Sequence, residues 1–394
     1  MQHPRTWVEV DLGAVARNLR RIRKALDRRT RILAVVKANA YGHGAVAIGR
    51  AALSHGASML GVGDSGEAIE LREAGISAPI VILGAVCDRE TEAVLYYRIT
   101  PTVHSRLKAS LLEAAARRAG TLLPVNVMVD TGMGRLGVRP ETAPSLIEYI
   151  LSCRNLRFAG LSTHFSTAHL ADTSFTLEQL ERFRRVLDEL ARRKMKPPLV
   201  HAANTAALFS LPETHFDMVR PGAGIYGIDP GNLSRLGIEL ESTLEWHTQI
   251  VFLKDVVEGT PIGYGRAYVA PRPMKIATLC VGYNDGFGFP LSNRAEVLVH
   301  GRRCRVLGNV TMDYIMADVT DVPGVRAGDT VTLIGRDRNE EITSGEVARM
   351  LGVPPYNIST ALGRRVKRVY KDTYRAATTP VLDRSRRRAD AASA

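Results

Sequence analysis

The sequence ILAVVK at residues 32–37 decides the fold, because five consecutive apolar residues are followed at once by a lysine. A strand with one face in water alternates apolar and polar residues, whereas an unbroken apolar run is typical of a strand buried on both faces in a parallel sheet. Residues 12–28, just before it, carry apolar side chains at helical spacing. The stretch therefore predicts a helix, then a buried strand with a lysine at its carboxyl end.

This alternation continues to about residue 225. Seven more short apolar or β-branched runs, which we interpret as strands, follow at 59–62, 80–83, 100–103, 125–129, 158–163, 199–202 and 218–219. Helix-like segments lie between them at 45–55, 65–74, 107–118 and 176–194. Eight is the number of parallel strands that closes a (β/α) barrel, which is the fold we predict. An open, doubly wound sheet is the alternative, and the lack of G-x-G-x-x-G after the first strand weighs against it.

From about residue 239 the pattern changes to short strand-like runs separated by Gly, Pro, Asn and Asp, typical of a mostly β domain. A chain of 394 residues also fits two domains better than one. We predict a barrel at 11–238 and a β-rich C-terminal domain at 239–380, which an N-terminal strand at 5–10 joins. Residues 381–394 form a basic tail that we expect to be disordered.

Composition narrows the function further. Apolar residues make up 45% and charged residues 24%, which excludes global disorder. The sequence shows no apolar run of membrane-spanning length and no secretory signal, so we expect a cytoplasmic protein without a membrane partner. We expect no metal, because the cysteines lack metal-ligand spacing; they are Cys87, Cys153, Cys280 and Cys304.

The charge is strongly basic, with 53 Lys and Arg against 40 Asp and Glu, a net charge of +13. The excess lies on the outer face of the helix at 12–28 and between residues 364 and 388. Neither zinc-finger spacing nor an aromatic RNA-binding signature accompanies it. We therefore expect no nucleic-acid partner, and infer that the charge attracts anionic small molecules.

Functional residues of such barrels lie at the carboxyl ends of the strands. Lys37 ends the first strand, where burial lowers the pKa of an amine and makes it nucleophilic, as a Schiff-base lysine requires. A lysine that reaches the surface is the alternative. His164 ends the sixth strand, where an imidazole can also satisfy local backbone groups.

Two glycine- and alanine-rich turns suggest a phosphate site. The seventh strand ends in HAANT at 201–205, and the eighth in RPGAG at 220–224. Loops after strands 7 and 8 are where such barrels bind phosphate, through exposed backbone N–H groups. A phosphate site together with a nucleophilic Lys37 points to pyridoxal phosphate.

Seven blocks, in order along the chain, resemble the signature blocks of the bacterial alanine racemases. They are residues 34–44, 130–137, 201–205, 218–227, 262–265, 281–286 and 311–313. The similarity extends from about residue 6 to 368. It implies a pyridoxal-phosphate-dependent amino-acid racemase, an α/β barrel followed by a β domain, that interconverts L- and D-alanine and supplies D-alanine for peptidoglycan. Racemisation of serine or another amino acid, a fold-related decarboxylase and a cofactor-carrier protein are the alternatives.

The resemblance implies a two-base mechanism. Lys37 would hold the cofactor covalently and act as base on one face of the substrate α-carbon, and Tyr264 would act on the opposite face. His164 would link Tyr264 to Arg220, and Arg220 would donate to the pyridine nitrogen. Because an arginine stays protonated and donates this hydrogen bond, the pyridine nitrogen would remain unprotonated. A decarboxylase would place a carboxylate there, and a carrier would lack the β domain with Tyr264.

Other matched positions complete the implied site. The cofactor-binding residues would be Tyr41, Asn204, Thr205, Gly222, Ala223 and Tyr356, the substrate would contact Arg135 and Met312, and Asp313 would support them. In the family the β domain of one subunit completes the other's site, so the resemblance implies a homodimer with shared sites. Met128 is a departure, because many members carry at that position a carbamate-modified lysine that steadies the arginine.

Overall fold

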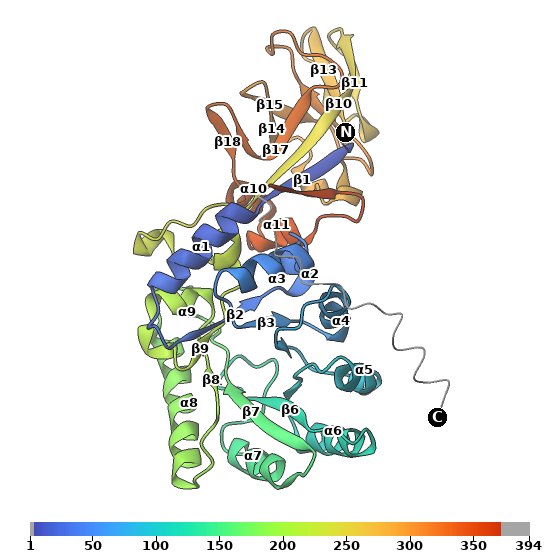
Figure 1. The fold of residues 1–394 in the computed structure, drawn as a ribbon. Helices are drawn as coiled ribbons and strands as arrows, with labels where there is room; N and C mark the ends of the chain where they lie inside the picture. The colour runs from blue at the N-terminus through green and yellow to red at the C-terminus, as the bar shows by residue number, and fades with distance from the viewer. Residues whose placement is uncertain (1–3, 372–394) are drawn as a thin grey trace, which may run out of the picture.

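The computed structural model describes residues 4–371, and its first part is a closed parallel barrel (Figure 1). The strands are β2 (Arg31–Val35), β3 (Met59–Val62), β4 (Ile80–Ile82), β5 (Thr102–Val103), β6 (Leu123–Met128), β7 (Leu156–Ser162), β8 (Val200–His201) and β9 (Met218–Val219). Their order is β4-β3-β2-β9-β8-β7-β6-β5, and a parallel bridge between Val81 and Thr100 joins the two edges. The predicted barrel is confirmed.

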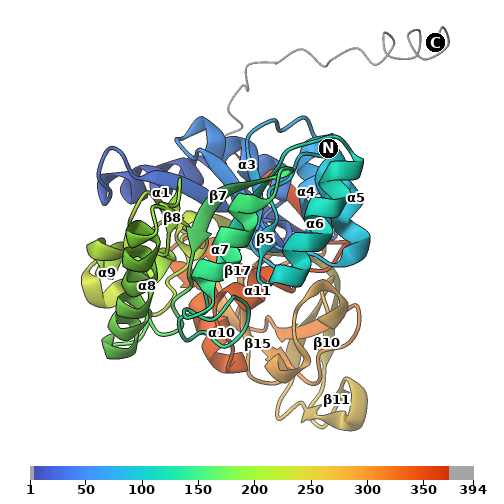
Figure 2. The same cartoon turned by 90° about the horizontal axis from the view of Figure 1, so that it is seen from below.

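Helices surround the barrel on the outside (Figure 2). They are α1 (Leu12–Lys24), α3 (Ala45–Ser54), α4 (Ser65–Glu73), α5 (Thr91–Tyr96), α6 (Arg106–Arg118), α7 (Ala143–Ser152), α8 (Ser174–Arg192) and α9 (Thr205–Ser210). In α1 the Asp11 side chain caps the first turn, and Val15, Leu19 and Ile22 are buried. No helix was predicted at α5, α7 or α9. Helices α5 and α9 have only six residues each, whereas α7 does carry apolar residues at helical spacing, with Leu146, Ile147 and Ile150 buried.

The second part is a nine-stranded sheet in the order β18-β17-β14-β15-β16-β13-β10-β1-β19, with a further β17–β10 pairing that curls it back on itself. Its strands are β1 (Thr6–Asp11), β10 (Leu244–Val256), β13 (Met274–Leu279), β14 (Glu296–Val299), β15 (Arg302–Leu307), β16 (Ile315–Asp318), β17 (Thr330–Asp337), β18 (Glu340–Ile342) and β19 (Lys367–Lys371). The smaller elements are the hairpin β11 (Pro261–Ile262) and β12 (Tyr268–Val269), and the helices α10 (Ser344–Leu351) and α11 (Tyr356–Thr360).

The first and last strands of the described residues, β1 and β19, lie in the same sheet. Strand β1 pairs antiparallel with β10 and parallel with β19, before the chain enters the barrel through α1 (Figure 1). Residues 372–380, which the predicted β domain included, and the expected tail at 381–394 lie outside the described residues. Within residues 4–371 we find no helix that is both long and apolar enough to span a bilayer.

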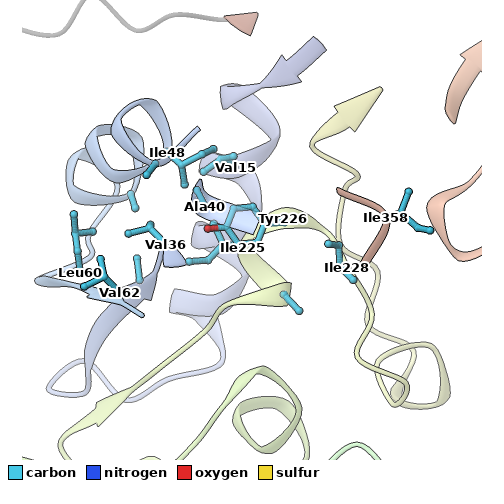
Figure 3. Packing of buried hydrophobic residues seen from close by; sticks show 14 of the residues in the cluster. Val15, Val36, Ala40, Ile48, Leu60, Val62, Ile225, Tyr226, Ile228 and Ile358 are labelled. Carbon is cyan, nitrogen blue, oxygen red and sulfur yellow. The ribbon is translucent and has the colours of Figure 1, made fainter. Parts of the chain in front are cut away.

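An apolar wall supports the first strand end of the barrel (Figure 3). Val36, directly before Lys37, belongs to one buried cluster with Val15 of α1, Ile48 of α3, Leu60 of β3 and Tyr226. Tyr226 ends the short helix η3 (Ala223–Tyr226), and its hydroxyl donates to the Val35 carbonyl at 2.9 Å. Close packing on this side leaves the segment after β2 little freedom to move.

Candidate active site

A cavity of about 850 Å³ opens at the carboxyl ends of the barrel strands. Ten of the residues that the sequence analysis assigned to a site line it: Lys37, Tyr41, Arg135, His164, Asn204, Thr205, Arg220, Gly222, Ala223 and Tyr356. Met128 lines it as well. These residues are far apart in sequence, and they meet because all parallel strands of a barrel end on the same side.

Lys37 begins the turn α2 (Lys37–Tyr41), in which residues 38–41 all adopt left-handed backbone conformations. For a residue other than glycine, this conformation raises the conformational energy by roughly 1–2 kcal/mol. Among the hydrogen bonds that hold the turn, Ala38 N–H donates to Glu67 Oε1 at 2.5 Å, Ala45 N–H to Asn39 Oδ1 at 2.8 Å, and Arg368 to the Gly42 carbonyl at 3.0 Å. Contacts from α4 and from the β domain therefore help to hold the turn in its strained conformation.

The charge state of Lys37 depends on its surroundings. Burial lowers the pKa of its amine, the charge of Arg135 lowers it further, and the carboxylate of Glu67 opposes both effects. A lower pKa increases the fraction of neutral amine, which is the nucleophilic and basic form. The alternative of a lysine that reaches the surface does not describe this side chain, since it lines the cavity.

Arg220, at the end of β9, is a buried cation with only neutral partners. It is 5% exposed and donates to the carbonyls of Thr163, His201 and Ala202 at 2.7, 2.8 and 3.0 Å. Burial lowers the pKa of its guanidinium to about 10, so it stays charged at neutral pH. No described residue accepts a hydrogen bond from its Nε–H, which leaves this donor for a bound group.

His164 lies beside Arg220, with Nδ1 at 3.2 Å from a terminal guanidinium nitrogen. A guanidinium only donates, so this Nδ1 accepts. Burial, followed by the charges of Arg220, Arg135 and Lys37, lowers the pKa of His164 to about 3. The imidazole is therefore neutral and carries its proton on Nε2.

The other end of the cavity offers hydroxyl donors. Thr205 Oγ1 accepts from the Gly222 and Gly224 N–H groups at 3.1 Å each, which leaves its own proton free to be donated. Burial raises the pKa of Tyr41 to about 12, so its hydroxyl also remains a donor. A Cβ on Gly222 would lie 2.6 Å from Tyr41 Oη, so only glycine allows this approach. The Asn204 side chain caps α9 by accepting from Ala207 N–H at 3.0 Å.

Of the predicted residues of the β domain, Tyr356 at the start of α11 lines this cavity, whereas Tyr264, Met312 and Asp313 do not. Tyr264, in the short helix η5 (Tyr264–Arg266), is 76% exposed, and Met312 is 54% exposed. Asp313 accepts from Arg365 at 2.6 Å, and Arg365 also binds the fully buried Asp285 at 2.5 and 2.9 Å. Arg365 thus ties two of the sequence blocks together on a surface that lies apart from the barrel mouth.

Sequence reasoning missed several residues around the site. Glu67 accepts from the N–H groups of Ala38 and Gly63, and so joins the ends of β2 and β3 beside Lys37. His201, within a quoted block, and Asn126 of β6 are buried polar residues behind Arg220. For His201 and Asn126, the only signal in the sequence is a polar residue within an otherwise apolar strand.

One group of possible metal ligands exists among residues 4–371, namely Glu9, Glu245 and His247 in the β domain. His247 Nε2 lies 3.6 Å from Glu245 Oε2 and 3.9 Å from Glu9 Oε2. The ammonium of Lys371 pairs with Glu9 and lies 3.9 Å from Glu245. The ammonium thus balances one of the two carboxylate charges, and the cluster joins β19 to β1 and β10.

Fold and site together define a barrel protein with a buried lysine at one strand end and a polar cradle at two others, the arrangement of a site for a covalently held, phosphorylated cofactor. Residues 10–230 match the family model for the N-terminal domain of alanine racemase, and residues 243–370 match that for its C-terminal domain. The chain belongs to the alanine racemase family.

Individual relatives agree with this assignment. The alanine racemase of Halothermothrix orenii is 41% identical over 367 residues, which is 93% of this chain and 97% of the relative. The structure of alanine racemase from Clostridium difficile 630 has a TM-score of 0.90 at 32% identity and covers 94% of this chain and 97% of its own. That from Bartonella henselae, with covalently bound pyridoxal phosphate, has a TM-score of 0.83 at 28% identity, covering 94% and 100%.

Proposed function

We propose that this protein is a pyridoxal-phosphate-dependent racemase that interconverts L- and D-alanine. Its family membership supports the reaction and the cofactor. The observation that carries the proposal is the cavity itself, in which Lys37 shares one lining with the unpaired donor of Arg220 and the hydroxyls of Thr205 and Tyr41. The D-alanine would serve peptidoglycan synthesis in the cytoplasm.

The residues present fit this cofactor. Thr205 and Tyr41 would donate to its phosphate, Arg220 would donate through Nε–H to its ring nitrogen, and Lys37 would hold it covalently. When bound, pyridoxal phosphate withdraws electrons from the substrate α-carbon and so makes the α-proton removable. Gly222 leaves room for the hydroxyl of Tyr41, whose ring stacks on Tyr226 with centroids 4.8 Å apart.

Two bases would move the proton. Lys37, with its lowered pKa, would act on one face of the α-carbon. A single base tends to return its proton to the face from which it came, so inversion requires a second group opposite. We assign that role to Tyr264. Because Tyr264 is exposed and does not line the cavity of its own chain, it would enter the site of a second copy, together with Met312 near the substrate carboxylate.

The alternative functions make different demands on the residues of this chain. A decarboxylase would pair the ring nitrogen with a carboxylate, yet Arg220 has no acidic partner among its hydrogen bonds. A cofactor carrier would lack the β domain. A racemase for serine or another amino acid would keep all the residues above, so substrate choice needs a direct measurement.

The test is a chirality assay with the cofactor-loaded protein and optically pure L-alanine, L-serine and L-lysine. D-alanine as the main product is expected. Faster formation of D-serine or D-lysine would keep the chemistry and change the substrate. Release of carbon dioxide without inversion would overturn the racemase proposal.

Shared sites can be tested by mixing two inactive variants, Lys37→Ala and Tyr264→Phe. In a mixed dimer one site would receive both defects and the other neither. After unfolding and refolding together, equal amounts should recover about a quarter of the wild-type activity, because half of the dimers are mixed and each has one intact site. No recovery, with dimers present, would place Lys37 and Tyr264 of one site in the same chain.

A further inference from the structure

A chain of buried polar side chains crosses the barrel behind Arg220. Arg220 donates to His201 Nδ1 at 2.9 Å, and His201 Nε2 lies 3.1 Å from Asn126 Oδ1. Asn126 is 3% exposed and His201 1% exposed. Beyond them, Asn126 Nδ2 reaches Ser162 Oγ at 3.0 Å and Thr102 Oγ1 at 3.4 Å. The chain therefore links β9, β8, β7, β6 and β5 within an otherwise aliphatic interior.

The donor and acceptor groups of these side chains allow hydrogen bonds to be donated in only one direction along the row. A guanidinium has donors and no acceptor, so His201 Nδ1 must accept. Burial, and then the charge of Arg220, lowers the pKa of His201 well below its usual value, so the imidazole is neutral. Its single proton is then on Nε2 and is donated to Asn126 Oδ1. The amide nitrogen of Asn126 donates onward, and the two hydroxyls donate to the carbonyls of Val127 at 3.4 Å and Ile82 at 2.6 Å.

We propose that Asn126 is a positioning residue that holds His201 in the Nε2-protonated form and thereby fixes the orientation of Arg220. The fixed guanidinium keeps its Nε–H directed to the cavity as the unpaired donor. The tautomer of His201 depends on the chain's own residues alone. Only its consequence for turnover rests on the proposed function.

Removing the acceptor would change the balance of tautomers. Without Asn126 Oδ1, the Nε2–H would be buried without a partner. In the other tautomer, an Nδ1–H would face a guanidinium N–H, and Arg220 would have to turn away. An unmatched buried donor shifts such an equilibrium roughly ten- to a hundredfold. A Cβ on Gly160 would lie 2.9 Å from Asn126 Oδ1, so the glycine leaves space for this amide oxygen.

The test uses ¹⁵N-histidine-labelled protein, both cofactor-free and cofactor-loaded, with the His201 signals assigned by their loss in His201→Gln. Long-range nitrogen–proton NMR distinguishes a protonated from an unprotonated ring nitrogen. The wild type should carry the proton on Nε2. A proton on Nδ1 in the wild type would overturn the proposal, whatever the outcome for the Asn126 variants.

Three substitutions separate the acceptor Asn126 Oδ1 from the other members of this row of hydrogen bonds. Asn126→Leu removes both functions of the amide at similar volume and should lose the single tautomer, alter the absorbance of the bound cofactor and lower turnover about ten- to a hundredfold. Thr102→Val removes only a far hydroxyl and should leave the His201 tautomer unchanged. Asn126→Asp keeps an acceptor and should retain the proton on Nε2.

The results of these experiments distinguish a failure of the positioning proposal from a failure of the proposed racemase function. A folded Asn126→Leu protein with the wild-type tautomer and cofactor absorbance would contradict a positioning role for Asn126. If the tautomer changes as expected in the cofactor-free protein, but neither protein racemises alanine, the positioning of Arg220 stands and the proposed function fails.

Discussion

The barrel mouth and the β-domain surface carry the two groups of proposed site residues, and they differ in how firmly the chain holds them. At the mouth, buried hydrogen bonds fix Arg220, while the bond from Ala38 N–H to Glu67 and an apolar wall hold the segment at Lys37 before any ligand binds. On the β domain, Tyr264 and Met312 are exposed and lie away from the cavity. The barrel strand ends, together with Tyr356 of α11, line the cavity, whereas Tyr264, our proposed second base, does not line the cavity of its own chain.

This difference suggests a division of tasks. Groups that must hold a cofactor gain from rigidity, because the orientation is then already present when it binds. Groups that come from a second copy can be ordered only on association. Variants at the barrel mouth should therefore affect cofactor binding, and variants of Tyr264 should affect proton transfer without loss of the cofactor.

The largest effect is expected for Lys37→Ala. It removes both the covalent link and one base, so turnover should fall by roughly 10⁴-fold. Borohydride treatment followed by mass spectrometry should attach the cofactor to the wild-type chain and not to the variant. Covalent attachment at another lysine, with turnover retained, would contradict the assignment.

Tyr264→Phe should reduce turnover by about 10²–10³-fold through loss of one acid–base group. The cofactor should stay covalently bound, which contrasts with Lys37→Ala. We assign to Tyr264 the face that carries the α-proton of L-alanine, so exchange of this proton in deuterated water should be lost from L-alanine. Tyr96→Phe, at a tyrosine that is 81% exposed on α5, is the matched control and should behave as wild type. Near-normal turnover in both directions for Tyr264→Phe would remove the two-base assignment.

His43 links the lysine turn to the linker before β10, and it makes stability dependent on pH. Its ring bonds the Tyr41 carbonyl at 3.0 Å and Thr243 at 2.9 Å, and burial lowers its pKa from 6.5 to about 4. Between these pH values the unfolded chain binds a proton that the folded chain does not, so stability falls as the pH falls. Below pH 4 the expected loss in the free energy of unfolding, relative to neutral pH, is roughly 3 kcal/mol.

Denaturant unfolding of wild type and His43→Gln from pH 8 to 4 measures this contribution. The variant does not titrate at this position and should lose less stability over the same range. Equal slopes for the two proteins would show that His43 is protonated in the folded state.

The smallest effect is expected for Gly222→Ala. The added Cβ would displace the Tyr41 hydroxyl, because its position is 2.6 Å from Oη. The affinity for pyridoxal phosphate should fall about tenfold, as expected for one weakened hydrogen bond. In the control variant Gly345→Ala, on α10, the nearest atom would lie 3.7 Å from the new Cβ, and affinity should not change. An unchanged affinity in Gly222→Ala would mean that Tyr41 does not contact the phosphate.

Much of the fold could be predicted because burial leaves a periodic record in the sequence. Unbroken apolar runs such as 32–36 marked the parallel strands, and the change near residue 239 marked the β-rich region. The residues at strand ends followed from topology, since the barrel places all carboxyl ends on one side. Short helices such as α5, with only six residues, left no comparable record.

The sequence by itself determined the barrel, the lysine at the end of its first strand and the family. Only the tertiary structure decided the left-handed turn after Lys37, the clamp made by Glu67, and the direction of the Arg220–His201–Asn126 chain. The physical reason is that hydrogen bonds between distant segments depend on distances of a few tenths of an ångström. Hydrophobic periodicity records which side of an element is buried, but it contains nothing about which polar atoms meet there.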